Sequence, residues 1–302
     1  WDVAGRRELR SLTGHEGPVE SVAFAPGGRT LASAAADRTV RLWDTATGKE
    51  LRRWPSQGGG PCVAFAPDGR TLAAGDGAEV RLLEVATGGE RGRFTGHRGA
   101  VLALAFAPDG RALASGSQDS TAVVWDVTGR PGAGRPAPEE VEGLWADLGG
   151  DDAARAFAAL GTLAPAPDLA LPPLRGCLRP VAPLSRERLA RLVRDLDDDD
   201  FEVRERATDE LAQLGGAAEG ALRRALEGKP SAELKQRVEL LLGKLQTAST
   251  SPRRLLESRA LELLERLRAP EAKELLKELA AGDADAWLTR EAKAALGRLE
   301  RR

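Results

Sequence analysis

The sequence predicts a multidomain fold that is all-β in its first part and all-α in its second. The first 130 of its 302 residues hold 8 of the 12 Trp and Phe residues and 20 of the 34 Gly. Within them a Val/Leu-Ala-Phe-Ala-Pro block recurs, with Phe24, Phe65 and Phe106 each 41 residues apart. After residue 184 Gly and Pro become sparse, and apolar residues return at helical spacing.

Each repeat is predicted to form four short strands joined by tight turns. In the first repeat we expect strands at 19–24, 31–34, 40–43 and 50–54, because these apolar or alternating runs are bounded by turn residues. Residues 8–12 precede them and are predicted to be the outer strand of an earlier unit. A period near 40 residues with four strands per period is typical of β-propeller blades.

Residues 1–130 resemble part of a WD40-repeat β-propeller, with about three blades and a leading strand. The resemblance rests on Gly-His and Trp-Asp pairs that recur 82 residues apart. In that family a His, a Ser or Thr, a turn Asp and a Trp form a buried network that locks each blade. The resemblance gives these roles to His15, Ser33, Asp37 and Trp43 in the first repeat, and to His97, Ser115, Asp119 and Trp125 in the third.

The middle repeat departs from this pattern. A Gly run at 58–60 stands where Gly-His is expected, and Leu83 replaces the Trp. This blade is therefore expected to rely on apolar packing alone.

Three blades do not close a ring, because propellers have about 4–8 blades. The sequence begins with the pair Trp1-Asp2, which elsewhere ends the third strand of a blade, and no fourth strand is predicted after Trp125. We therefore expect further propeller blades upstream in the same chain, and the family resemblance implies seven blades in all.

A linker rich in Pro and Gly is predicted at 131–138, followed by a helical domain at 139–302. Helices are expected wherever the apolar spacing is helical and Ser, Asp or Gly residues mark the ends. Their predicted ranges are 139–148, 151–163, 168–178, 185–196, 200–214, 217–227, 232–246, 253–268, 271–281 and 285–301.

The helical half resembles HEAT repeats of the bilin-lyase type, best defined over 185–300. The resemblance rests on the apolar spacing of Leu189, Leu192 and Leu196, the Asp-Asp-Phe motif at 199–201, and a degenerate copy at 288–299. It implies an α-solenoid. The combination with WD40-type blades resembles large planctomycete-type bacterial multidomain proteins, which carry upstream regulatory modules such as sigma-factor-like regions.

Composition argues against several kinds of chemistry. A net charge of −2 excludes a strongly basic nucleic-acid or membrane binder, and two Cys exclude a disulfide scaffold. The acidic run Asp197–Asp200 fails as a calcium loop beginning at Asp195, because Asp200 and Arg206 stand where Gly and Glu are required. Weak divalent binding there is left open. No catalytic residue, cofactor, metal site, small-molecule substrate or membrane segment is predicted.

The function expected from these features is a non-catalytic scaffold for protein–protein interaction, in the cytoplasm, forming the C-terminal sensing or assembly arm of a larger bacterial regulatory protein. The alternative is the targeting arm of an enzyme or sigma-factor-like regulator whose active module lies upstream. Candidate partner contacts on the blades and the helices are Glu20, Ala36, Leu102, Gln118, Arg204 and Arg206. For the two Arg residues, pairing with Asp199 or Asp200 is the alternative role.

Overall fold

The computed structural model describes residues 5–58, 62–129, 135–181, 185–227, 230–248, 251–284 and 286–301. The chain divides into a β-unit, Trp1–Arg130 with Asp152–Ala158, and a helical unit, Pro131–Asp151 with Ala159–Arg301. The short segment Asp152–Ala158 therefore groups with the strands, although the sequence placed it in the helical domain. The motif at Trp1, residues 59 and 60 of the Gly run, and positions 131–134 of the predicted linker lie outside the described residues.

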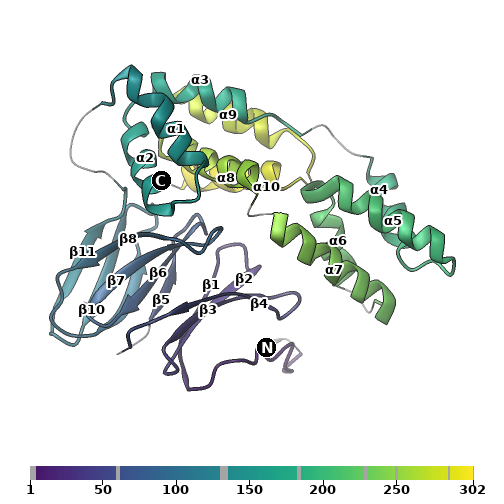
Figure 1. Cartoon of the computed structure of the whole chain (residues 1–302), viewed down its shortest axis with the longest axis horizontal. Coiled ribbons are helices and arrows are strands. Elements are labelled where there is room, and N and C mark those ends of the chain that lie inside the picture. The colour runs from purple at the N-terminus through teal and green to yellow at the C-terminus, as the bar shows by residue number, and fades with distance from the viewer. Residues whose placement is uncertain are drawn as a thin grey trace. The chain divides into compact units, whose positions relative to one another are not determined.

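The β-unit contains three antiparallel sheets, each built from consecutive strands (Figure 1). The first sheet comprises β1 (Val19–Phe24), β2 (Thr30–Ala35), β3 (Thr39–Asp44) and β4 (Glu50–Pro55). The second comprises β5 (Val63–Phe65), β6 (Thr71–Asp76), β7 (Glu79–Glu84) and β8 (Glu90–Thr95). The third comprises β9 (Val101–Phe106), β10 (Ala112–Ser117) and β11 (Ala122–Asp126), with β10 in the middle.

The same turn joins the first two strands of every sheet. Gly28, Gly69 and Gly110 adopt φ values of +66°, +71° and +70°, which Gly reaches without a Cβ clash. The repeated Pro-x-Gly motif therefore builds the same hairpin in each sheet.

Apolar side chains of the first two sheets pack face to face. Ala32, Ala34, Val40 and Leu42 from the first sheet meet Val63, Leu72, Ala74 and Leu83 from the second, and Trp54 joins the cluster. All of these residues are buried. This contact shows which face of one sheet fits which face of the next.

The prediction of a strand at 8–12 was wrong, because these residues have no strand ladder in the structure. A strand requires a neighbour to accept and donate its backbone hydrogen bonds, and no described strand of this chain lies beside residues 8–12.

The structure confirms a helical second half, with ten α-helices in the described residues. They are α1 (Val141–Gly149), α2 (Ala153–Leu163), α3 (Pro167–Cys177), α4 (Arg186–Asp195), α5 (Phe201–Leu214), α6 (Glu219–Ala225), α7 (Ala232–Ala248), α8 (Pro252–Arg266), α9 (Pro270–Ala280) and α10 (Trp287–Glu300). Two 3₁₀ turns, η1 (Pro138–Glu140) and η2 (Gly215–Ala217), precede α1 and α6. Two N-caps expected from the sequence are present, since Ser185 Oγ accepts from the Arg188 amide and Asp200 Oδ1 accepts from the Glu202 amide. A Gly cap expected at Gly161 is wrong, because this residue lies inside α2.

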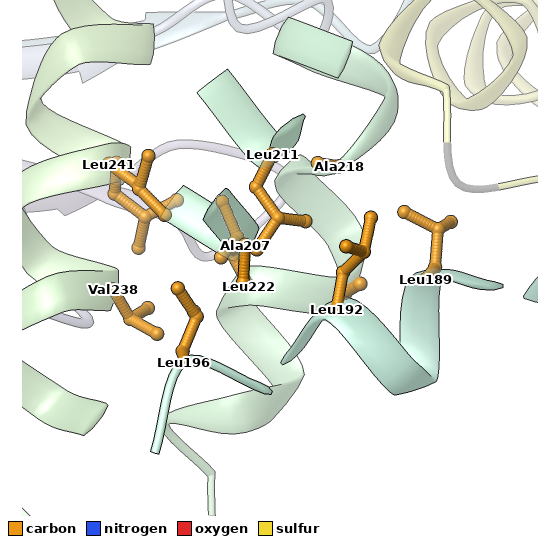
Figure 2. Close-up of a cluster of buried hydrophobic side chains, with 11 residues drawn as sticks. Leu189, Leu192, Leu196, Ala207, Leu211, Ala218, Leu222, Val238 and Leu241 are labelled. Carbon is orange, nitrogen blue, oxygen red and sulfur yellow. The ribbon is translucent and has the colours of Figure 1, made fainter. Parts of the chain in front are cut away.

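Helices α4 to α7 enclose one apolar core (Figure 2). Leu189 and Leu192 of α4, Leu211 of α5, Leu222 of α6 and Leu241 of α7 all point into it. The regular Leu spacing in the sequence is the spacing of one buried helix face.

Helix α8 is the centre of a second group of helices and contacts α1, α9 and α10. It carries charge into this core: Arg259 is 1% exposed and donates to the carbonyls of Leu148 (2.8 Å) and Gly150 (2.6 Å), at the end of α1. A cation at a helix C-terminus satisfies carbonyls that have no helical partner.

Candidate functional site

The four predicted network residues of the first sheet lie within hydrogen-bonding distance of one another. His15 Nδ1 is 2.8 Å from Asp37 Oδ2, and His15 Nε2 is 2.7 Å from Ser33 Oγ. Trp43 Nε1 donates to the same Ser33 hydroxyl at 2.8 Å. Because a carboxylate only accepts hydrogen bonds, Nδ1 donates to Asp37.

The third sheet repeats this arrangement almost atom for atom. His97 lies 3.0 Å from Asp119 Oδ2 and 2.7 Å from Ser115 Oγ, and Trp125 Nε1 donates to Ser115 Oγ at 2.7 Å. The His97 side chain is fully buried. Because the same network recurs at an interval of 82 residues, the sequence repeat specifies it.

Sequence reasoning missed one member of each network. Thr39 Oγ1 donates to Asp37 Oδ1 at 2.7 Å, and Thr121 Oγ1 donates to Asp119 Oδ1 at 2.6 Å. The signal was present in the sequence as Asp-x-Thr in both repeats. The Thr residues orient each carboxylate toward its His.

Each Asp also fixes a loop. Asp37 Oδ2 accepts from the Glu16 amide at 3.0 Å, and Asp119 Oδ2 accepts from the Arg98 amide at 2.8 Å. Burial alone would raise the pKa of Asp37, but hydrogen bonds from Thr39, Glu16 and His15 outweigh it and lower that pKa. For Asp119, hydrogen bonds from Thr121 and Arg98 lower the pKa. Both groups are held as carboxylates.

The middle sheet does not depend on apolar packing alone, as the sequence had suggested. Leu83 is fully buried, but Asp76 accepts from Ser56 Oγ at 2.9 Å and lies 3.6 Å from Arg81. Arg91 and Glu84 form a second ion pair at 2.9 Å, with side chains only 1% and 2% exposed. The middle sheet therefore adds ion pairs between Arg and carboxylate side chains to its apolar packing.

The order Ser-His-Asp has the distances of a catalytic triad but not its chemistry. A triad needs a Ser oxygen that a substrate can reach. Here Ser33 and Ser115 are 4% and 2% exposed, and each oxygen already accepts an indole proton. The networks thus favour a structural role.

The four candidate contacts on the blades lie at one end of their strands, in two equivalent pairs. Glu20 and Leu102 are the second residues of β1 and β9, and Ala36 and Gln118 directly follow β2 and β10. The backbone N–H of Ala36 donates to the Pro18 carbonyl and that of Gln118 to the Ala100 carbonyl, both at 2.9 Å, just before β1 and β9 begin. All four side chains are exposed, and Leu102 is 50% exposed.

The two candidate Arg residues of α5 differ in their surroundings. Arg204 Nη1 donates to the carbonyls of Asp198 (2.6 Å) and Asp199 (3.0 Å), and its guanidinium lies over the Phe201 ring. It therefore contacts the acidic turn through backbone oxygens, and Arg206 is exposed. Among the described residues, no group of three His, Cys, Asp or Glu side chains is placed to hold a metal ion.

Comparison with known families decides the nature of the repeats. The model of the WD domain, G-beta repeat, matches residues 6–44 and 88–126, the two segments that hold the histidine networks. The first part of this chain carries WD40 repeats. The resemblance seen in the sequence is confirmed for that part, whereas the HEAT-like and bacterial parts of the prediction stay predictions.

Known proteins match only part of the chain. It is 43% identical over 54 residues to human serine-threonine kinase receptor-associated protein, covering 18% of this chain and 15% of that protein. It is 54% identical over 43 residues to the periodic tryptophan protein 2 homolog of Neurospora crassa, covering 14% and 5%. The chain spans less than a fifth of the length of either relative.

A solved structure entitled "Structure of U3-55K" is 32% identical, with a TM-score of 0.37, over 39% of this chain and 38% of that one. No described helix of this chain combines the length and the apolar character needed to cross a membrane.

Proposed function

We propose that this chain is a non-catalytic scaffold that binds a partner protein through the rim bearing Glu20, Ala36, Leu102 and Gln118. The observation that carries the proposal is the attachment of this rim to the histidine networks. Asp37 and Asp119 bond the loop amides of Glu16 and Arg98 as well as the imidazoles. A rim fixed in this way loses little conformational entropy when a partner binds.

The test uses the full chain as bait in extracts of its source cells, with captured proteins identified by mass spectrometry. Glu20→Lys combined with Gln118→Lys should remove a specific partner, because both side chains are exposed on the proposed rim. Lys49→Glu is the matched control, since it changes an exposed charge in the turn at the opposite end of the strands. Equal capture by both variants contradicts the rim as the binding surface.

We propose that the helical half is a HEAT-like α-solenoid. Five residues separate α4 from α5, a link short enough to favour antiparallel neighbours, and both helices share one core. Arg206 is its candidate contact, because Arg204 is occupied by the turn carbonyls. Arg206→Glu should weaken binding of a partner that uses the solenoid and leave thermal stability unchanged.

In the cell, we propose that the chain serves as the C-terminal sensing or assembly arm of a larger bacterial regulatory protein. Its alternative role is the targeting arm of an enzyme or sigma-factor-like regulator. A competing hypothesis is that this chain binds DNA directly. Such binding would weaken steeply as the salt concentration rises, so the absence of measurable DNA affinity at low salt would exclude this hypothesis.

A further inference from the structure

Two arginines fill the same kind of slot beside successive sheets. Arg10 donates to two backbone carbonyls of the turn that joins β3 to β4, at 2.6 and 2.7 Å. Arg52, 42 residues later, donates to two carbonyls of the turn that joins β7 to β8, one of them that of Val85 at 3.1 Å. In both places an Arg that precedes the sheet in the chain holds the turn between its last two strands.

A glycine in each of these turns makes room for the arginine. Gly48 and Gly88 adopt φ values of +76° and +80°. A Cβ at Gly48 would lie 2.9 Å from Arg10 Cδ, and a Cβ at Gly88 would lie 3.2 Å from Arg52 Cδ. Both distances are shorter than an ordinary van der Waals contact, so each Arg side chain lies directly on its Gly.

At the third sheet a phenylalanine takes the place of the arginine. Gly129 adopts φ +73° in the shorter segment that follows β11. A Cβ at Gly129 would lie 3.0 Å from Phe157 Cε1 and 2.7 Å from the Phe157 carbonyl oxygen. Phe157 is 7% exposed and belongs to the β-unit as part of Asp152–Ala158. An aromatic ring therefore fills the third slot.

The strand β8 explains why no arginine competes with this ring. Strand pairing places Arg52 opposite Leu42 and Gly92 opposite Leu82, so Gly92 stands where the first sheet has its Arg. No described atom lies within 4 Å of the position that a Cβ would take at Gly92. The slot is therefore open on the side from which an arginine would reach it.

The neighbouring Arg91 makes the slot suitable for an aromatic ring. Its guanidinium carbon lies 5.3 Å from the centroid of the Phe157 ring, which is within the range of a cation–π interaction. The Arg91 side chain is 1% exposed and donates to Glu84 Oε1 and Thr71 Oγ1, both at 2.9 Å. These bonds hold the cation in a fixed, buried position, where it is attracted to the face of a ring.

A second contact anchors the same segment on the turn of the second sheet. A Cβ at Gly89 would lie 2.8 Å from the Cβ of Ala153. Ala153 and Phe157 are four residues apart in α2 and therefore lie on one face of that helix. This face contacts the turn of the second sheet and the segment after the third, as Arg52 bridges the first sheet and the second.

We propose that the slot between the second and third sheets is a binding site for an aromatic side chain carried on a helical turn, and that Asp152–Ala158 is its ligand within the chain. Arg91, Gly92 and Gly129 form the site, and Phe157 is the side chain that it binds. All of these contacts lie within the β-unit. The site is separate from the proposed rim and does not depend on any partner that the rim binds.

The first test gives this slot the arginine that the first sheet has. In Gly92→Arg the introduced side chain should displace Phe157, because it can reach the carbonyls after β11 as Arg52 reaches that of Val85. In hydrogen exchange of the full chain, peptides covering Asp152–Ala158 should exchange at least about tenfold faster. Gly92→Ala is the matched control, because a methyl group is too short to fill the slot and should leave this exchange unchanged.

The second test empties the slot and then refills it. In Phe157→Ala, a peptide covering β11 and Gly129 should exchange at least about tenfold faster, because the side chain that covers this segment is removed. Adding Gly92→Arg to Phe157→Ala should return this exchange to within about threefold of the wild type. Peptides of α5 serve as the internal reference and should not change in either variant.

A third pair of variants separates an aromatic site from a merely apolar contact. Phe157→Leu keeps an apolar side chain but removes the ring that faces Arg91, so exchange of Asp152–Ala158 should rise at least about threefold. Phe157→Tyr keeps the ring and should stay close to the wild type. The proposal is overturned if Gly92→Arg leaves Asp152–Ala158 protected, if the double variant exchanges as fast as Phe157→Ala, or if the Leu and Tyr variants behave alike.

Discussion

Removing the hydroxyl shared by His15 and Trp43 should destabilise the first sheet more than the loss of one small polar group suggests. In Ser33→Ala, the indole N–H of Trp43 and Nε2 of His15 both lose their partner. Trp43 is 2% exposed, so water cannot replace the hydroxyl there. An unsatisfied buried group costs about 1–3 kcal/mol, and with two such groups affected we expect a loss of about 2–4 kcal/mol.

Hydrogen exchange with mass spectrometry is the suitable assay, because unfolding of a chain with two units does not follow a single two-state transition. Peptides covering β2 and β3 should exchange faster by the corresponding factor, and peptides of α8 should not change. Trp43→Phe removes the indole donor, so the effect of Ser33→Ala should shrink by about 1 kcal/mol in that background.

The reverse substitution in the middle sheet is the matched control. Ala74 is the equivalent of Ser33 and is 3% exposed, but that repeat has no His or Trp to bond a hydroxyl. Ala74→Ser should therefore destabilise rather than stabilise. An effect of Ser33→Ala below about 0.5 kcal/mol, or one of equal size in the Trp43→Phe background, would refute the reasoning.

Further predictions concern charge, strain and reactivity. The folded-state pKa of Asp37 lies below its unfolded value near 3.9, so its contribution to stability is complete at pH values above the unfolded pKa. This contribution should fade as the pH falls below the unfolded pKa. Denaturation of the wild type at decreasing pH should show the loss, and Asp37→Asn should flatten it. Arg91→Ala should cost about 3–5 kcal/mol in the local stability that hydrogen exchange of β7 and β8 peptides reports, because it leaves the Glu84 carboxylate buried without this partner. Ser120→Gly should add about 1 kcal/mol of stability, since Ser120 adopts φ +67° and Gly favours that region. Burial raises the pKa of Cys62 to about 11, so iodoacetamide should label it only after unfolding, as mass spectrometry can show.

Elements whose cause is local could be predicted from the sequence. The strands at Val19–Phe24 and Glu50–Pro55 agree with the expected ranges to within about a residue, because alternation and turn residues specify them. Helix α5 begins directly after its cap, Asp200, as expected. The same reasoning failed at 8–12, where the residue pattern of an outer strand is present but the pairing strand is not.

Contacts between distant residues could not be predicted. Apolar periodicity shows which face of a helix is buried but not what covers it, so nothing indicated that Asp152–Ala158 belongs with the strands. Arg259 lies 111 residues from the Leu148 carbonyl that it caps, and no spacing rule connects them. The middle sheet is similar: Arg91 and Glu84 look like ordinary surface charges until the fold buries them together.

The histidine networks show why residue identity and distance together do not establish a chemical function. Ser33, His15 and Asp37 have the order and separations that activate a nucleophile, and the aspartate orients the ring as it would in a hydrolase. The indole of Trp43 decides the outcome, because its N–H donates to the Ser33 oxygen at 2.8 Å and Ser33 is only 4% exposed. A network whose members are all bonded and buried gains rigidity and loses reactivity. Each Asp also accepts a hydrogen bond from the backbone amide of a rim loop, which holds that loop rigid. A binding surface requires such rigidity.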